Sequence, residues 1–191
     1  MKNKKIAQEQ SVITLVPIGL GKEDVLGAIG KDLEEAFACQ VRIANPLEIL
    51  ADSYNPSRNQ YQAPLFLRTL HRFMDPEKND KVLGVTDKDL YVEGLNFVFV
   101  QAELLGSFAV ISLARLHQSF YGLPEDHLLF LKRVTKEAVH ELGHTFGLSH
   151  CRHSDCVMYF SNSLHDTDQK STEFCPSCKT QLEQSLRIKK K

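Results

Sequence analysis

Hydrophobic and polar positions in the first part of the chain follow two different periods. Residues 12–17 are almost continuously apolar and rich in β-branched side chains, which predicts a buried strand that ends at Pro17 and Gly19. From residue 23 to residue 39 apolar side chains recur at helical spacing, and residues 41–44 predict a second strand. We therefore expect the chain to begin as strand, helix and strand, joined by a right-handed crossover.

The middle of the chain alternates between polar and apolar segments. Residues 45–62 contain prolines and many polar side chains and are predicted to form a loop or insertion. Residues 63–73 predict a second helix, with Pro64 in its first turn. Further strands are predicted at residues 82–85, 95–100 and 108–113. Together these elements predict a sheet of four or five strands with two backing helices.

A long amphipathic helix is predicted over residues 128–146, after a start signal at Pro124 and two acidic residues. Beyond it, residues 159–174 are too polar to build a core, and a final helix begins at Pro176. A C-terminal segment this short of apolar residues needs a covalent or metal staple.

Composition and charge exclude several classes of protein. The 191 residues, 42% hydrophobic and 25% charged, fit one globular domain. A net charge of −1 gives no electrostatic case for binding nucleic acid or an anionic membrane. No run reaches the ~20 apolar residues of a membrane helix, and the polar residues 8–11 and Pro17 interrupt a possible signal peptide. We expect a cytoplasmic monomer whose basic termini are solvated.

Residues 140–150 read His-Glu-Leu-Gly-His-Thr-Phe-Gly-Leu-Ser-His. On a helix, His140 and His144 lie one turn apart on the same face and can bind one zinc ion. Gly147 can adopt the left-handed backbone conformation that reverses the chain, so that His150 becomes a third ligand. Three protein ligands leave the open position of a catalytic site.

Glu141 stands beside these ligands, where it can act on a zinc-bound water. A lone His-Glu-x-x-His arises by chance on amphipathic helices. Here the longer pattern is specified at five positions, since Gly147 and the third histidine are also present. The sequence therefore favours a metal site over a coincidental surface pattern.

The cysteines predict a second metal site. Cys39 ends a helical pattern and is expected to be a small buried hydrophobe. The others are Cys151, Cys156, Cys175 and Cys178. Four thiolates would close a tetrahedral shell around a structural zinc that does no chemistry. A redox-active Cys-x-x-Cys pair and structural disulfides are the alternatives.

Written out, the pattern is His-Glu-x-x-His-x-x-Gly-x-x-His-Cys, four residues, Cys-x-Met, sixteen residues and Cys-x-x-Cys, over residues 140–178. It resembles the archaemetzincin family of zinc metallopeptidases in the metzincin clan. The resemblance implies that Met158 is the methionine of the Met-turn, a hydrophobic floor beneath the zinc. It also implies that residues 95–100 form an antiparallel edge strand along the substrate cleft.

The resemblance further implies an α/β (α+β) fold of metzincin type. We expect a mixed twisted sheet, two backing helices, a long active-site helix and a small zinc-stapled C-terminal lobe that ends in a helix. Residues 1–191 would form one metallopeptidase domain, with an upper lobe at residues 11–147 and a lower lobe at residues 148–191. Two zinc ions would bind, one catalytic and one structural.

The expected reaction is hydrolysis of a peptide bond by a zinc-bound water with Glu141 as general base. The substrates would be short peptides or free N-termini, as in aminopeptidase-like activity. Candidates for a second oxyanion donor are Tyr159, His153 and Tyr121. Histidines expected to be surface or core residues are His71, His117, His127 and His165. The alternative is a zinc-binding regulatory protein with little proteolytic activity.

Overall fold

The computed structural model describes residues 11–21, 24–77 and 80–188. Predictions for residues 1–10, for residues 22–23 at the start of the first helix and for the basic residues 189–191 lie outside these ranges. Among the described residues, no helix combines the length and the apolar character needed to cross a membrane.

The main sheet has the strand order β2-β1-β5-β8-β7. Its strands are β1 (Val12–Pro17), β2 (Gln40–Ile43), β5 (Lys81–Thr86), β7 (Val100–Ala102) and β8 (Phe108–Ser112). β1 pairs in parallel with β2 and β5, and β5 pairs in parallel with β8. β7 runs antiparallel to β8 at the edge. The strand–helix–strand start and the mixed sheet are as predicted.

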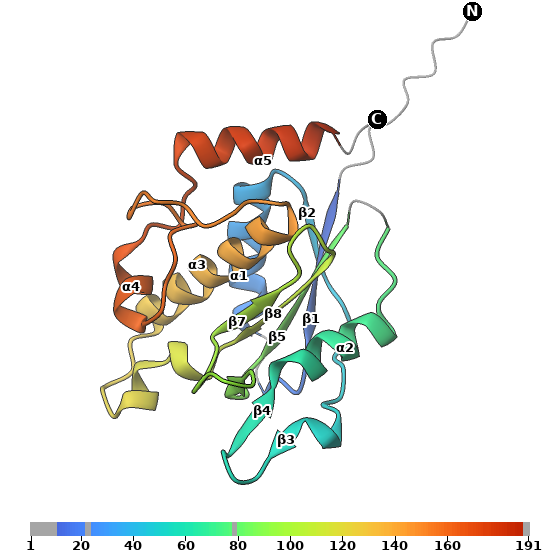
Figure 1. Cartoon of the computed structure of the whole chain (residues 1–191), viewed down its shortest axis with the longest axis vertical. Coiled ribbons are helices and arrows are strands. Elements are labelled where there is room, and N and C mark those ends of the chain that lie inside the picture. Colours follow the sequence, from blue (N-terminus) through green and yellow to red (C-terminus); the bar gives the residue numbers. More distant parts are fainter. Residues whose placement is uncertain (1–10, 22–23, 78–79, 189–191) are drawn as a thin grey trace, which may run out of the picture.

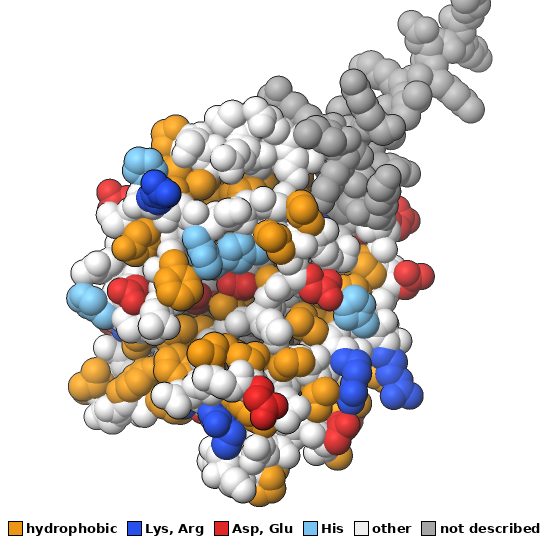
Figure 2. Space-filling model, viewed as in Figure 1, with side chains coloured by type: hydrophobic (Ala, Val, Ile, Leu, Met, Phe, Trp, Pro, Cys, Tyr) orange, Lys and Arg blue, Asp and Glu red, His pale blue; other side chains and the backbone are white. Residues whose placement is uncertain are grey.

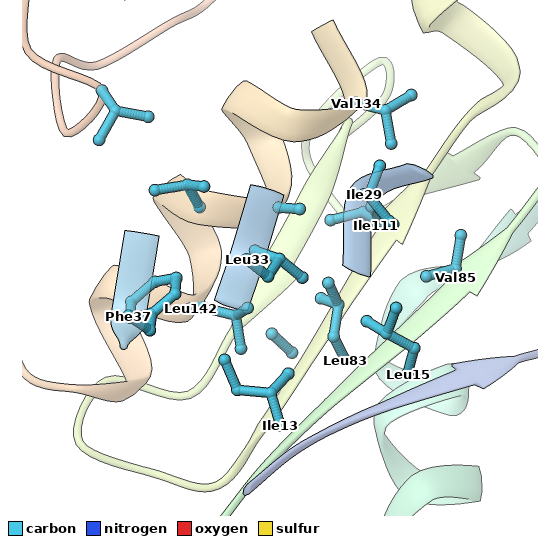
Figure 3. Packing of buried hydrophobic residues seen from close by; sticks show 14 of the residues in the cluster. Ile13, Leu15, Ile29, Leu33, Phe37, Leu83, Val85, Ile111, Val134 and Leu142 are labelled. Carbon is cyan, nitrogen blue, oxygen red and sulfur yellow. The ribbon is translucent and has the colours of Figure 1, made fainter. Parts of the chain in front are cut away.

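Helices cover both faces of this sheet because side chains alternate along each strand. One face packs against α1 (Asp24–Phe37) and α3 (His127–Thr145), and the other packs against α2 (Ala63–Phe73) (Figure 1). The first face carries Ile13, Leu15, Leu83, Val85 and Ile111, and the second carries Val16, Val82 and Val110. Figure 3 shows the first of these clusters, with Leu33 and Phe37 of α1 beside Leu142 of α3.

The loop predicted over residues 45–62 contains ordered elements, so this prediction was partly wrong. They are a 3-10 helix (Ala51–Ser53), β3 (Tyr54–Asn55) and β4 (Gln60–Gln62). β3 and β4 form a hairpin, and β4 also pairs with β6 (Leu90–Tyr91). Strands of two or three residues are too short to leave a periodic pattern.

The strand predicted over residues 95–100 was misplaced, because the edge strand β7 begins only at Val100. Side chains occupy the backbone carbonyls that a strand would need. Arg58 donates to the carbonyls of Leu95 and Asn96, at 2.9 and 2.8 Å, and Gln60 donates to that of Asn96 at 3.0 Å. Residues 95–96 are thus bonded by side chains distant in sequence, and the amide of Val98 donates to the carbonyl of Leu90, in β6, at 2.9 Å instead of to the main sheet.

The second half of the chain builds the site. Asp126 caps α3 by accepting from the amide of Leu129 at 2.9 Å, which confirms the predicted start. Short 3-10 helices (Ala114–Leu116 and Gln118–Tyr121) precede it. The polar segment contains α4 (Leu164–Gln169), which the sequence did not indicate, and α5 (Pro176–Ile188) begins at the predicted residue.

Candidate active site and second metal centre

The C-terminal end of α3 forms a tight reversal. The amide of Gly147 donates to the carbonyl of His144 at 2.9 Å, and the amide of Leu148 donates to that of Gly143 at 3.0 Å. This pair of bonds is a Schellman motif, which requires a left-handed residue after the helix. Gly147 supplies it with φ of 94°, as predicted. The chain then folds back and brings His150 to the helix.

His140, His144 and His150 come together as the sequence predicted. One ring nitrogen from each lies within 4.8 Å of the others. His140 is buried, His144 is half-buried and His150 is exposed, so the group opens to solvent on one side. Figure 2 shows histidine side chains gathered on one face of the molecule, between hydrophobic side chains.

Backbone carbonyls determine which nitrogens are available to a metal. Nδ1 of His140 lies 2.8 Å from the carbonyl of Val157, and Nδ1 of His144 lies 2.7 Å from that of Leu148. A carbonyl only accepts, so both Nδ1 atoms carry the proton and both Nε2 atoms are left with lone pairs.

These two Nε2 atoms face each other at 3.1 Å. Two acceptors at this separation repel unless they share a cation. Zinc–nitrogen bonds of 2.0–2.1 Å in a tetrahedron place neighbouring nitrogens about 3.3 Å apart. The donor set therefore fits zinc.

Burial keeps these imidazoles neutral, which metal ligation requires. Burial is the largest cause of the lowered pKa of His140, which falls to about 2, and the Lys170 charge is the next. Burial also lowers the pKa values of His144 and His150.

Glu141 lies beside the histidines in a nearly closed environment. Its Oε1 is 3.9 Å from Nε2 of His140, and 6% of its side chain is exposed. The pKa of this carboxyl is raised to about 8, first by burial and then by the Glu137 charge, while the Lys170 charge acts to lower it. A carboxyl with this proton affinity can take up and release a proton near neutral pH.

Met158 is completely buried and packs against α3. A Cβ added to Gly143 would lie 2.5 Å from its sulfur, so only glycine permits this approach. The contact falls on the turn of α3 that separates His140 from His144. Phe160, two residues further on, places its ring 4.9 Å from that of His150.

The second group joins Cys151, Cys156, Cys175 and Cys178, whose sulfurs all lie within 4.8 Å of one another. All are free thiols. The sulfurs of Cys151 and Cys175 are 3.7 Å apart. Zinc–sulfur bonds of 2.3 Å in a tetrahedron give an edge of about 3.8 Å. This set also fits zinc.

Backbone amides support the thiols. The amide of His153 donates to the sulfur of Cys151 at 3.4 Å, and that of Cys175 donates to the sulfur of Cys156 at 3.3 Å. A hydrogen bond with the Ser177 hydroxyl is the main cause that lowers the pKa of the Cys175 thiol to about 6. Such contacts stabilise thiolates, the form that binds metal.

The two groups share backbone. Cys151 directly follows His150, and its amide donates to the carbonyl of Met158 at 2.8 Å. Cys156 directly precedes Val157, whose carbonyl holds His140. Cys151 is thus one peptide bond from His150, and Cys156 is one peptide bond from the residue whose carbonyl holds His140.

Sequence reasoning missed a buried polar network behind His140. Lys170, the residue after α4, places Nζ 3.1 Å from Oε1 of Glu137 and 3.5 Å from Nδ1 of His140. The sequence signal for this network was Glu137, an acidic residue one turn before Glu141 on the buried face of the helix. Lys170 lies in a polar segment that gave none.

Among the described residues, the remaining histidines lie outside both groups. His71 pairs with Glu103, and His117 pairs with Glu125. Tyr121, one of the proposed oxyanion donors, lies near Arg115 and Arg133. Burial raises the pKa of its hydroxyl, and the charges of the two arginines act to lower it. His153 lines a cavity of about 580 Å³ beside the cysteines.

Comparison with known proteins agrees with this geometry. The family model of peptidase family M54 matches residues 38–184. The chain belongs to peptidase family M54. It is 45% identical over 182 residues to an archaemetzincin of Pyrococcus furiosus, covering 93% of this chain and 95% of that relative. Membership of the family makes this chain a zinc metallopeptidase.

Solved structures of family members confirm the expected fold class. An archaemetzincin from Methanopyrus kandleri matches with a TM-score of 0.81 and 40% identity, covering 93% of this chain and 96% of that one. An archaemetzincin from Archaeoglobus fulgidus, complexed with malonate, matches with a TM-score of 0.76 and 38% identity, covering 89% of this chain and 99% of that one.

Proposed function

We propose that His140, His144 and His150 hold a catalytic zinc and that Glu141 is the general base for peptide hydrolysis. The observation that carries this proposal is the pair of Nε2 lone pairs at 3.1 Å, each fixed by a carbonyl on the opposite nitrogen. Two neutral imidazoles oriented in this way need a cation. The presence of Glu141 favours an enzyme over a zinc-binding protein without activity, because zinc binding alone needs no general base there.

A zinc ion held by these histidines would supply a Lewis acid, which would polarise the scissile carbonyl and lower the pKa of water. Glu141 takes a proton from the attacking water as the oxygen bonds to the carbonyl carbon. The protonated carboxyl then gives that proton to the amine nitrogen as the C–N bond breaks. Its burial supports this role, because transfer in both directions needs a proton affinity near the working pH.

The four cysteines are proposed to hold a second, structural zinc, giving two zinc ions per chain. Backbone amides on two of the sulfurs support thiolates at this site. We also propose a cytoplasmic monomer, because a reducing compartment keeps the four thiols free for metal. Residues 1–191 would act as one domain, with the upper lobe at residues 11–147 and the lower lobe at residues 148–191.

Short peptides, cleaved in an aminopeptidase-like manner, are the proposed substrates. The rim of the histidine group supports apolar contacts with a few residues of a peptide. Phe160 is 53% exposed beside His150, and Leu105, 70% exposed, donates its amide to the carbonyl of His144 at 3.1 Å.

The test compares wild type with Glu141→Gln, and uses Glu35→Gln, an exposed site on α1, as the control. Zinc content per chain and hydrolysis of fluorogenic peptides are measured. We expect two zinc ions in all three proteins and hydrolysis in wild type and the control only. Full hydrolysis by Glu141→Gln would exclude the general base. N-terminally acetylated peptides test the finer proposal, since an aminopeptidase-like enzyme cleaves them poorly.

A further inference from the structure

A fully buried cation lies directly behind the histidine group. The side chain of Lys170 is 0% exposed, and its ammonium lies 3.1 Å from Oε1 of Glu137, which is 3% exposed. The hydroxyl of Thr167 donates to the same oxygen at 3.1 Å. Burying two charges costs free energy unless they are paired and hydrogen-bonded, and breaking such a pair leaves an uncompensated charge.

This pair is close to a proposed metal ligand. The ammonium of Lys170 lies 3.5 Å from Nδ1 of His140. That nitrogen already donates its proton to Val157, so it cannot accept from Lys170. The contact between Lys170 and the imidazole is therefore electrostatic.

A positive charge behind a ligand opposes a dication bound to the other side of the same ring. Glu137, on the same helix and one turn before Glu141, neutralises it. We propose that Lys170 and Glu137 form a charge-balanced positioning pair that sets the zinc affinity of the histidine site. This inference rests on the proposed function, because it assumes that the histidines hold zinc.

The influence of Lys170 extends over the group. After burial, its charge is the largest cause of the lowered pKa values of His140 and His150. It acts in the opposite sense to burial on Glu141, whose pKa it lowers. The charge of Lys170 thus acts on all three histidines and on the proposed base.

A second ion pair between α3 and α4 offers a matched control. Arg133 binds Asp168 through two nitrogens, at 2.7 and 2.6 Å, and is 4% exposed. It precedes His140 by two turns of helix, about 10 Å along the axis. At that distance a single charge has much less effect on the metal than one beside the ligand. Breaking this ion pair shows how loss of packing between the two helices affects zinc binding when the charges beside the histidines are unchanged.

The test measures the zinc affinity of the full chain by competition with a chromophoric chelator. A His144→Ala chain defines the zinc that remains at the cysteines. The variants are Glu137→Gln, Lys170→Gln, their double variant and the control Asp168→Asn. We expect Glu137→Gln to weaken zinc binding at the histidine site on the order of tenfold or more, because Lys170 is then uncompensated.

Lys170→Gln should bind zinc more tightly than wild type, because Glu137 is then uncompensated, and the double variant should lie near wild type, as should Asp168→Asn. A purely structural pair would weaken binding in both single variants and in Asp168→Asn, and that result overturns the inference. If Glu137→Gln does not fold, Lys170→Gln must bind more tightly than the double variant; equal or weaker binding refutes the inference. Absence of zinc from the wild-type histidines would overturn the proposed function and this inference together.

Discussion

Gly143 and two of the cysteines show how strongly single residues in this chain depend on their surroundings. Gly143 leaves room for the sulfur of Met158, which lies 2.5 Å from the position that a Cβ would take. Cys39 and Cys175 carry the same thiol, yet burial raises the pKa of Cys39 to about 12, while the Ser177 hydroxyl lowers that of Cys175 to about 6. Each difference leads to a measurement.

Gly143→Ala should destabilise the fold. Its Cβ would lie 2.5 Å from the sulfur of Met158 and 3.1 Å from the terminal methyl. Overpacking of this kind costs about 1–3 kcal/mol, partly offset by the higher helix propensity of alanine. Gly27→Ala in α1 is the control, because its Cβ would meet nothing within 4 Å. Thermal melting should show a lower Tm for Gly143→Ala and an unchanged or higher Tm for Gly27→Ala. An equal rise in both would show that Met158 does not need this space.

Cys39 should resist alkylation in the native protein. The thiolate is the reactive form, and a pKa near 12, raised by burial and then by Glu34 and Asp80, leaves almost none at pH 8. After metal chelation, iodoacetamide should modify Cys175 first, and peptide mass spectrometry would identify the site. The denatured chain, in which all five cysteines react, is the control. Comparable native rates at Cys39 and Cys175 would contradict the assigned environments.

Among the secondary-structure elements, α3 was predicted well because its signals are local. The edge strand was misplaced because its segment contacts residues that are distant in sequence. Both ends of α3 are encoded by neighbouring residues, the Asp126 cap and the Gly147 reversal, and the helix lies within one residue of its predicted bounds. The misplaced edge strand depends on Arg58 and Gln60, more than thirty residues away in sequence. No local pattern contains that information.

Asp126→Ala should shorten or fray the start of α3. The lost cap costs about 1 kcal/mol, because the amide of Leu129 loses its acceptor. Asp126→Asn, which keeps an acceptor, should remain near wild type in chemical denaturation. Zinc content should not change, since the ligands lie at the other end of a 19-residue helix. Loss of zinc in Asp126→Ala would mean that the whole helix responds as one unit.

For the whole molecule, the sequence predicted that the three histidines would come together and that the four cysteines would come together, because these side chains carry the chemistry and their spacing is fixed. It did not predict how they are supported. The carbonyls of Val157 and Leu148, which orient two histidines, belong to the backbone and have no residue signature. The Lys170–Glu137 pair requires knowing that α4 packs against α3. Tertiary contacts of this kind appear only in the folded structure.

Cys175→Ser should reduce zinc at the histidines as well as at the cysteines. The two groups share the backbone between Cys151 and Met158, and the carbonyl of Val157 holds His140. Cys39→Ala, which touches neither group, is the control. Zinc content and the competition assay should both fall for Cys175→Ser only. Undiminished occupancy of the histidine site in Cys175→Ser would show that the two groups are independent.

The acceptors of the two oriented imidazoles also limit how far this site could be transplanted. An excised peptide of residues 126–150 would keep the acceptor of His144, because Leu148 is only four residues away. It would lose the acceptor of His140, because Val157 follows seventeen residues later. In such a peptide His140 could rotate and present either nitrogen. A graft of this site into another scaffold therefore also needs a separate segment that places a backbone carbonyl oxygen against Nδ1 of His140.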